Sequence, residues 1–566
     1  MKEEARNCQN CKKNFIIEPE DFLFYEKIKV PAPTFCPECR QQRRLCFRNE
    51  RTFYKRSCDM CNTEVVSRVS PDKKYPMYCK NCWWSDKWDP KEYGQDYDFC
   101  KPLFEQWKNL FFRVPHISMF NSNSINSDWI NQESDDKNCY LNVGGHYNEN
   151  SGYNTYEING KNCFDNYWIF NSDYCSNNIK CERNYFTNFS YDTHDCLNTN
   201  FSFNCRNCSN IIGCASLRNK QYCIFNKQYT KDDFNKFIKQ HPFSSNSGYV
   251  WWKEKSKEIW IKSPHRENTI FKAVDSTGND LNEVKNCHNC FEGTKLENCK
   301  YMYITGWIKD SYDCSSFGAS ELAYECAHSG GSYNSKSLLL CLSSDPLKKV
   351  TINNVEYSAI TTSSSNCFGC VGIRNGEYCI LNKKYSKEKY NKLVSKIKKH
   401  MDDMPYIDKT GKIYKYGEFF PGEFSPFGYN ETTAQEYIKL EKENAIIQGF
   451  NWSDYLSDTK YEFSDSIIPD DINDVKDDIL EKVLKCEETG KAYKIIPMEL
   501  SFYRQVKLPI PRKSPLARHN ERIAQLLPYK TFLRNCYKCK KEIKTSYSPD
   551  RPEIVYCEKC YQQEVY

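Results

Sequence analysis

"FCPECRQQRRLCFRNERTFYKRSCDMC" occupies residues 35–61 and contains two Cys-x2-Cys pairs separated by a strongly basic stretch. Seven basic residues and a single acid lie between Cys39 and Cys58. A Cys-x2-Cys pair folds into a knuckle that offers two sulfurs to one metal ion, and two knuckles complete a closed tetrahedral site. The stretch therefore predicts the junction of two metal sites, each completed by cysteines outside it.

The remaining Cys-x2-Cys pairs supply these partners. We expect three structural zinc ions, because four-thiolate sets leave no open coordination position for catalysis. In the second and third sets the segments 62–78 and 540–556 separate the knuckles, and we expect a β-hairpin in each, turning at "SPD" (70–72 and 548–550). The predicted ligand sets are Cys8, Cys11, Cys36 and Cys39; Cys58, Cys61, Cys79 and Cys82; and Cys536, Cys539, Cys557 and Cys560.

The two ends of the chain are copies of each other. Residues 8–82 match residues 486–560 without a gap when shifted by 478 positions. The second copy of the first metal site keeps only Cys486 and has Thr489, Ser514 and Ala517 in place of the other three cysteines. We therefore predict a C-terminal copy that keeps its shape but lacks this metal ion.

The pattern of residues 8–44 resembles a small family described as a probable zinc-ribbon or treble-clef domain. The shared features are a first knuckle followed by Lys-x-Phe, an acidic and aromatic turn at Phe24-Tyr25, a Pro-containing loop and a "CxxCR" knuckle that opens a helix. The resemblance implies the fold and the zinc ligands, and no activity. The overall layout also resembles a class of cysteine-rich bacterial proteins, which adds no function.

A second repeat lies in the middle of the chain. "CASLRNKQYCIFNKQYTKDDFNKF" (214–237) matches "CVGIRNGEYCILNKKYSKEKYNKL" (370–393), and each copy ends a Cys-, Asn- and Tyr-rich tract with nine cysteines. Cysteine spacings near 12 and 24, with Asn at the corners, favour an irregular β-solenoid with buried free thiols. The alternative is further zinc binding at Cys205/Cys208, Cys287/Cys290 and Cys367/Cys370.

The composition indicates the compartment. The chain has 33 cysteines among 566 residues, a net charge of +6 and no long apolar run, so we expect no membrane span. The acidic start "MKEEARNCQNC" does not read as a secretion signal, which predicts a reducing, cytoplasmic location with metal-bound rather than disulfide-bonded cysteines. The alternative is a disulfide-rich exported protein.

These observations predict a β-rich, multidomain chain in which duplicated treble-clef or zinc-ribbon modules flank a two-part β-solenoid-like core. The expected segments are an N-terminal double zinc module (1–100), a first β-repeat half (101–241), a connecting segment (242–286), a second β-repeat half (287–400), aromatic loops with an acidic linker helix (401–485) and a C-terminal duplicate module (486–566).

The basic stretch suggests a partner. A helix that begins near Cys36 places arginines at four-residue spacing on one face, where they could contact phosphates while neighbouring aromatic rings stack on bases. The candidate residues for nucleic-acid binding are Arg40, Arg43, Arg44, Arg48, Arg51, Arg518 and Arg522. The same arginines could instead pair with carboxylates of the acidic middle and brace the modules against it.

Three functional interpretations therefore remain open. The first is a zinc-stabilised protein that binds nucleic acid through the Arg-rich helices, and the second is a protein-binding or structural scaffold. The third is a β-solenoid enzyme such as a carbohydrate-active one. His194, and His328 beside Cys326, could be drawn as catalytic groups, but in a chain this rich in cysteine such neighbours arise by chance. We therefore assign no catalytic residue and expect no enzyme.

Overall fold

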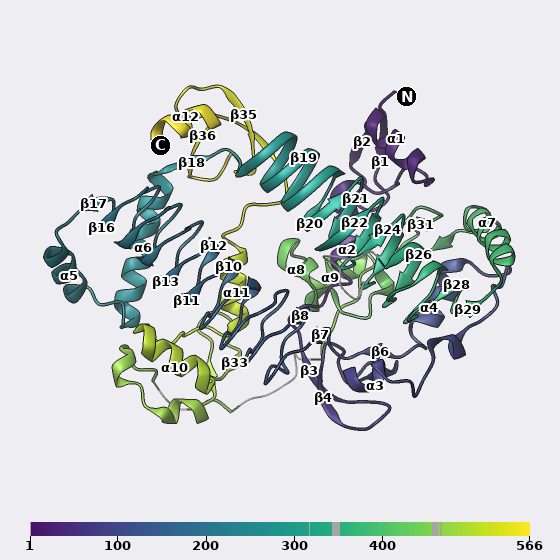
Figure 1. The fold of residues 1–566 in the computed structure, drawn as a ribbon, viewed down its shortest axis with the longest axis horizontal. Helices are drawn as coiled ribbons and strands as arrows, with labels where there is room; N and C mark the ends of the chain where they lie inside the picture. The colour runs from purple at the N-terminus through teal and green to yellow at the C-terminus, as the bar shows by residue number, and fades with distance from the viewer. Residues whose placement is uncertain (1, 316, 342–350, 456–461, 465–466) are drawn as a thin grey trace. The chain divides into compact units, whose positions relative to one another are not determined.

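The computed structural model describes residues 2–315, 317–341, 351–455, 462–464 and 467–566 (Figure 1). It is β-rich and divides into two compact units. The N-terminal unit comprises Met1–Ser118 and Asn268–Leu456, and the C-terminal unit comprises Met119–Glu267 and Ser457–Tyr566. The N-terminal module therefore shares a unit with the second half of the core, and the C-terminal module shares a unit with the first half.

The two modules contain the same elements in the same order. Helix α2 and strands β3 and β4 recur as α11, β34 and β35, at the shift already seen in the sequence. The N-terminal module consists of β1 (Glu4–Asn7), β2 (Asn14–Ile17), α1 (Pro19–Lys27), α2 (Pro37–Leu45), β3 (Tyr54–Ser57), β4 (Glu64–Ser67), β5 (Met77–Tyr78) and α3 (Lys80–Trp84). The C-terminal module consists of β32 (Leu484–Lys485), β33 (Ala492–Tyr493), α10 (Pro497–Val506), α11 (Pro515–Ile523), β34 (Phe532–Asn535), β35 (Glu542–Thr545), β36 (Ile554–Tyr556) and α12 (Glu558–Val565).

The hairpin in these modules differs from the one expected at the "SPD" turn. Strand β4 pairs antiparallel with β3, so the hairpin turns at the Cys58–Cys61 knuckle. The short strand β5 pairs instead with β6 (His116–Ile117). The expected acidic linker helix is also absent among the described residues of 469–488, where two 3-10 helices, η4 (Ile472–Asp474) and η5 (Asp477–Glu481), precede β32.

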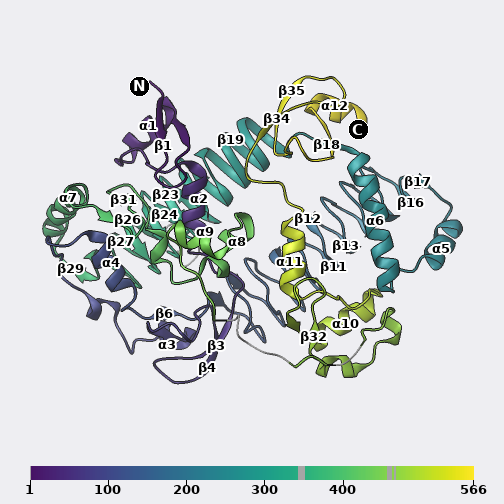
Figure 2. The same cartoon turned by 180° about the vertical axis from the view of Figure 1, so that it is seen from behind.

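Each half of the core is built from short parallel strands that follow one another at a regular spacing in the sequence. In the first stack, residues 121–228, Tyr185 pairs with Leu197 and Leu197 pairs with Ser209. In the second stack, residues 270–384, Tyr312 pairs with Tyr324 and Tyr324 with Lys336. Each coil of the chain thus lies directly above the previous one (Figures 1 and 2).

Backbone conformation explains the coiling. Almost every third residue of both stacks has φ near +50°, for example Asn177, Lys180, Arg183 and Phe186. This left-handed conformation turns the chain at each corner, and Asn adopts it more readily than most residues do. Strand β19 (Ile270–Lys300), although 31 residues long, is therefore not straight but coils in the same way.

Asparagine side chains join successive coils through hydrogen bonds between equivalent corners, as in Asn126–Asn138–Asn150. The strands of the first stack are β7 (Asn121–Ser122), β8 (Glu133–Ser134), β9 (Thr155–Ile158), β10 (Tyr167–Phe170), β11 (Asp173–Ser176), β12 (Ile179–Glu182), β13 (Tyr185–Asn188), β14 (Leu197–Asn200), β15 (Ser209–Ile212), β16 (Gln221–Ile224) and β17 (Lys227–Gln228). After β19, those of the second stack are β20 (Tyr303–Lys309), β21 (Tyr312–Ser315), β22 (Phe317–Glu321), β23 (Tyr324–Ala327), β24 (Ser332–Tyr333), β25 (Lys336–Leu339), β26 (Ile352–Ala359), β27 (Ser365–Phe368), β28 (Glu377–Ile380) and β29 (Lys383–Lys384).

Both stacks end in the same way. A short antiparallel strand, β17 or β29, closes the last coil, and a helix follows, α5 (Lys231–Gln240) or α7 (Lys387–Asp403). These are the two helices expected from the apolar spacing of the repeat. They contact the last strand through Tyr222–Phe234 and Tyr378–Tyr390 ring pairs, which covers an edge that would otherwise be open to further strand pairing.

The remaining elements cover the stacks. Helix α6 (Asn246–Lys262), in the segment expected only to connect the halves, lies along the first stack and packs Trp252 and Trp260 on its aromatic residues (Figure 1). The other elements are η1 (Pro90–Tyr93), α4 (Leu103–Phe111), β18 (Pro264–Arg266), β30 (Tyr406–Ile407), β31 (Ile413–Tyr414), η2 (Gly422–Phe424), η3 (Tyr429–Glu431), α8 (Thr433–Tyr437) and α9 (Lys442–Ile447). Among the described residues, none of the helices has the length and apolar character needed to cross a bilayer.

Candidate metal centres and buried arginine clusters

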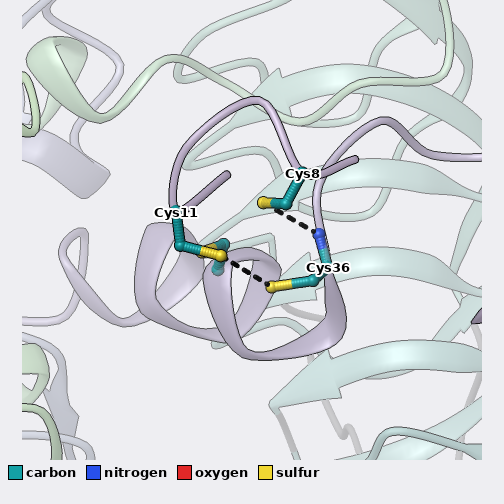
Figure 3. Close-up of side chains that lie close together, drawn as sticks. Cys8, Cys11 and Cys36 are labelled. Carbon is teal, nitrogen blue, oxygen red and sulfur yellow. Dashed lines mark hydrogen bonds between the residues drawn. The ribbon is translucent and has the colours of Figure 1, made fainter. Parts of the chain in front are cut away.

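The first cysteine group lies where two elements of the N-terminal module meet. The β1–β2 hairpin carries Cys8 and Cys11, and Cys36 is the N-cap of α2. The sulfurs of Cys11 and Cys36 point toward each other at 3.7 Å, and the Cys36 N–H donates to the Cys8 sulfur at 3.3 Å (Figure 3). Cys39, one turn into the helix, completes the group.

The second and third groups repeat this geometry. The Cys61 and Cys79 sulfurs are 3.8 Å apart, and the Cys79 N–H donates to Cys58 at 3.1 Å. In the C-terminal module the Cys539–Cys557 distance is 3.7 Å. In each of the three groups all four sulfurs lie within 4.8 Å of one another. The groups are Cys8, Cys11, Cys36 and Cys39; Cys58, Cys61, Cys79 and Cys82; and Cys536, Cys539, Cys557 and Cys560.

These distances fit a four-coordinate metal ion. Metal–sulfur bonds of about 2.3 Å in a tetrahedron separate neighbouring sulfurs by about 3.8 Å. The four protein thiolates fill the coordination sphere, so a bound ion would hold the knuckles together and would not take a substrate. The three ligand sets predicted from the spacing of the cysteines are thus the three groups that could hold metal.

The C-terminal counterpart of the first group has the same backbone without the ligands. Cys486 is buried in the β32–β33 turn, and Ser514 caps helix α11 by accepting the Ala517 N–H at 3.4 Å. Burial opposes ionisation of Cys486, but hydrogen bonds from Ser514 and Thr489 outweigh it and lower the pKa of this thiol to about 7. Packing of apolar side chains around Cys486 takes the place of the metal ion.

The arginine row of α2 faces the second stack and not solvent. Arg40, Arg43 and Arg44 have side chains no more than 3% exposed. Arg44 bridges two carboxylates, with Nη1 at 3.2 Å from Asp313 and at 2.8 Å from Glu325. The full set of pairs is Arg40–Asp313 (2.9 Å), Arg43–Glu325 (2.8 Å) and Arg43–Glu418 (3.1 Å), besides the two pairs of Arg44.

The C-terminal module repeats this contact on the first stack. Arg518 pairs with Asp165 and with Glu499, each at 3.0 Å. Arg522 pairs with Asp165 at 3.1 Å and bonds to the Asn177 side chain at 3.3 Å. Arg518 and Arg522 correspond to Arg40 and Arg44, so an arginine helix docks on a strand stack in both units.

The receiving surfaces of the stacks are also duplicated, at a shift of 148 positions. Asp165 corresponds to Asp313 and Asn177 to Glu325. Arg518 lies over the Tyr153 ring at 5.0 Å, and Arg40 lies over the corresponding Tyr301 ring at 5.2 Å. The shift becomes 156 positions beyond residue 350, because the coil that leads from Lys336 to its strand partner Glu356 is longer than the others. The unit that was duplicated therefore includes both a module and a stack.

Electrostatics agrees with this docking. Burial alone would lower the pKa of Arg44, but the carboxylates of Glu325 and Asp313 outweigh burial and hold it above its ordinary value. The N-terminal cluster balances three guanidinium groups against three carboxylates, and the C-terminal cluster balances two against two. At the position of Arg43 the C-terminal helix has Glu521, which instead pairs with Lys253 and Lys513.

The last two candidate arginines are also paired. Arg48 lies 4% exposed beside Glu50 at 2.5 Å, and Arg51 lies 3.4 Å from Glu436. Helix α2 ends at Leu45, so neither residue extends its face. All seven arginines named for nucleic-acid contact are thus engaged inside their own unit, which is the bracing arrangement, and not the exposed row.

The cysteines of the stacks are buried thiols. All 33 cysteines of the chain are free, and those in the two stacks are buried. Cys205 and Cys208, one of the three central pairs, donate to the carbonyls of Phe203 and Arg206 at 3.4 and 3.3 Å. Within the described residues, the central pairs do not belong to any group of three or more close metal-ligand atoms.

The two candidate histidines also lack a catalytic arrangement in the described contacts. His194 bonds to Asp192 at 3.0 Å, and Cys196 donates instead to the His194 carbonyl. Cys326 faces the stack interior, where its thiol donates to the Tyr324 carbonyl at 3.5 Å. No family model matches the chain, and no curated protein is detectably similar to it.

Sequence reasoning missed the partners of the arginines. Asp165, Asp313 and Glu325 lie in tracts that look like any other Asn- and Tyr-rich coil. The signal that could have found them is the shift of 148 positions, which aligns Asp165 with Asp313 and Phe164 with Tyr312. These aromatic rings contact equivalent residues of the modules, Phe502 at 4.5 Å and Phe24 at 3.8 Å.

Proposed function

We propose that this protein is a zinc-stabilised scaffold in which two β-solenoids present the binding surface and a treble-clef or zinc-ribbon module braces each of them. The observation that carries the proposal is the duplicated burial of the arginine helix. Both modules direct Arg40/Arg44 or Arg518/Arg522 onto carboxylates of a strand stack. Zinc is the metal of choice because it favours closed tetrahedral thiolate sites.

The energetics of buried ion pairs supports a bracing role. Taking a guanidinium and a carboxylate out of water costs about as much as their attraction returns, but removing one partner leaves an uncompensated charge and costs about 3–5 kcal/mol. Such clusters therefore specify where the module docks. Arginine suits this role because its planar guanidinium can bridge two carboxylates, as Arg44 does.

Hydrogen exchange of the intact protein before and after chelation tests the bracing. We expect amides of the stacks near Asp165 and Asp313 to lose protection together with the modules, because the arginine clusters join them. If the modules lose protection while these coils keep theirs, the modules do not brace the stacks and the proposal fails.

Nucleic-acid binding is the second candidate, with a different surface. On the second stack Trp307 is 36% exposed, and Lys295 lies 5.5 Å from its ring. Lys285 and Lys309 border the same shallow hollow of about 450 Å³. A half-exposed aromatic ring among lysines suits the stacking and phosphate contacts of a single strand, although Glu283 and Glu297 offset part of the charge.

Fluorescence anisotropy with single-stranded RNA and DNA oligonucleotides tests this candidate. Binding through this face should weaken steeply between about 50 and 200 mM salt and be lost in Trp307→Ala. Tyr333→Ala, which removes a 43% exposed ring elsewhere on the same stack, is the control. Absence of binding at low salt would exclude nucleic acid and leave the scaffold proposal intact.

A further inference from the structure

The interior of the first coils of the first stack is acidic, unlike the cysteine- and isoleucine-lined coils that follow. Glu133, Asp136 and Glu157 occupy inward positions and are 4%, 1% and 0% exposed. Among the described residues no Lys or Arg forms an ion pair with any of them. Three buried carboxylates without a counter-ion are strongly unfavourable, because an unpaired charge loses its hydration.

Each of these carboxylates uses one oxygen and leaves the other without a partner. Asp136 Oδ1 accepts the Asn148 N–H at 2.8 Å, and Glu133 Oε2 accepts the Asn148 amide at 3.2 Å. Glu157 Oε2 accepts the amides of Asn142 and Asn154 at 2.9 and 2.8 Å. The second oxygens, Glu133 Oε1, Asp136 Oδ2 and Glu157 Oε1, are buried and have no hydrogen-bond partner.

The coil fold does not need this polarity. At the shift of 148 positions the second stack has Leu281, Val284 and Thr305 in place of the three acids. The asparagines that hold the carboxylates are likewise replaced, by Cys290, Leu296 and Met302. Leu281 and Val284 are 1% and 2% exposed, so apolar side chains fill the same interior positions. The acids must therefore serve something other than packing.

We infer that the interior of the first stack holds a hard divalent cation of the calcium class, bound by the carboxylates of Glu133, Asp136 and Glu157. Only oxygen donors converge there, and carboxylate with amide oxygens is the ligand chemistry that Ca²⁺ prefers. Zinc would favour the thiolate groups of the modules.

The backbone leaves room for such an ion. Glu133, Gly145 and Glu157 stand at the same position of three successive coils, so no side chain separates the two glutamates at the middle position. Among the described residues, only the cysteine groups already have all donor atoms within 4.8 Å of one another. The cation draws the free carboxylate oxygens together through rotation of the Glu133 and Glu157 side chains.

Burial has a second outcome to be tested, protonation. It raises the pKa of Glu157 to about 8 and that of Glu133 well above its ordinary value. If the acids stay protonated and hydrogen-bonded at neutral pH, the protein binds no cation at this place. Cation binding at pH 7.5 therefore separates the two outcomes directly.

The experiment uses the full-length, zinc-loaded protein. We expect one Ca²⁺ per chain by isothermal titration calorimetry, one Tb³⁺ by luminescence with Ca²⁺ competition, and a Ca²⁺-dependent rise in melting temperature. The isosteric variant Glu133→Gln/Asp136→Asn/Glu157→Gln should weaken binding about 100-fold or more, because affinity follows the number of charged ligands.

Two further variants keep the test decisive. Glu133→Leu/Asp136→Val introduces the residues of the second stack and should fold, by circular dichroism and zinc content, without binding Ca²⁺. Glu182→Gln/Asp195→Asn removes surface acids of the same stack and should leave binding unchanged. Absence of Ca²⁺ and Tb³⁺ binding to the wild type, or unchanged binding in the isosteric variant, overturns the inference.

Discussion

The N-terminal and C-terminal modules share every helix and strand, but one first-site cysteine group is complete and the other is reduced to Cys486. The arginine contacts show the opposite behaviour, since Arg40 and Arg44 have counterparts that reach equivalent positions on the other stack. A metal site can thus be lost while the docking surface persists. The comparison indicates that docking onto the stack, rather than the first metal ion, is the feature common to both modules.

The C-terminal module replaces the metal by packing and capping. Cys486 and Ala517 lie in an apolar cluster with the aromatic residues of α10, and Ser514 supplies the helix cap. Metal binding to such small modules is itself folding free energy, so the N-terminal module depends on its ion while its copy depends on its core.

The largest expected effect is therefore on metal removal from the N-terminal module. Cys36→Ser should cost the chain one of three zinc ions and unfold β1, β2 and α1, because structural zinc contributes about 10–16 kcal/mol in small zinc modules. The matched change Ser514→Ala removes only a helix cap and should cost about 1 kcal/mol. Metal analysis and hydrogen exchange measure both effects.

A zinc count gives the control for this prediction. The wild-type chain should contain three zinc ions and Ser514→Ala the same three. Four ions in the wild type, or three retained in Cys36→Ser, would contradict the assignment of the ligands.

The second effect concerns the arginine clusters. Arg44→Met leaves Asp313 and Glu325 facing a neutral side chain and should destabilise the N-terminal unit by about 3–5 kcal/mol. Arg522→Met should cost less, because the position of Glu325 is held by neutral Asn177 and Arg518 still faces Asp165. Urea unfolding, with hydrogen exchange assigning the loss to a unit, measures the difference.

A compensating variant sharpens this test. Arg44→Met/Glu325→Asn restores the charge balance and should recover part of the loss. Equal losses for Arg44→Met and Arg522→Met, with no recovery in the double variant, would mean that the carboxylates do not set the energetics of docking.

Sequence alone predicted the parts of this structure that depend on local spacing. The three cysteine groups follow from Cys-x2-Cys geometry, and the end-to-end duplication follows from an ungapped match. The regular register of the coils was partly visible in the cysteine spacing. The β3–β4 hairpin was misplaced because alternating residues around "SPD" gave a local signal, whereas the strands actually pair across the Cys58–Cys61 knuckle.

The docking partners could not be predicted, for a physical reason. Arg44 and Glu325 are 281 residues apart, and the N-terminal module packs on the second stack although the first stack follows it in the chain. Exposed and buried arginine rows look identical in sequence, since only the partner decides whether a guanidinium is desolvated. The acids at Asp313 and Glu325 carry no local pattern that identifies them as partners.

The third prediction restores the lost site. Thr489→Cys/Ser514→Cys/Ala517→Cys recreates the ligand pattern of the N-terminal module on a backbone with the same elements. We expect a fourth zinc ion and a stabilisation of about 2.7 kcal/mol when free zinc exceeds the dissociation constant about 100-fold. Metal analysis and melting with and without zinc measure this. Expression of a folded variant that still binds three ions would show that the C-terminal backbone has diverged too far to coordinate metal.

The smallest effect separates the two stacks by pH. In the first stack, burial opposes protonation of His194, but hydrogen bonds to Asp192 and Glu182 outweigh it and raise its pKa. A histidine with a raised folded-state pKa stabilises the protein fully below its unfolded value of about 6.5, and this contribution is lost as pH rises through the folded value. His328 in the second stack is the reverse case, since burial and the guanidinium groups of Arg48 and Arg68 lower its pKa.

The two histidines should therefore give opposite pH profiles. His194→Asn should remove less than about 1 kcal/mol of stability near pH 6 and nothing well above the folded pKa, because the group is partly exposed. His328→Asn should remove a penalty that appears only as pH falls below about 6.5, so its stability relative to wild type rises in acid. Urea unfolding from pH 5.5 to 8.5 measures both slopes. Parallel profiles for the two variants would mean that the carboxylates beside His194 do not hold its proton, and that the two stacks do not differ in this respect.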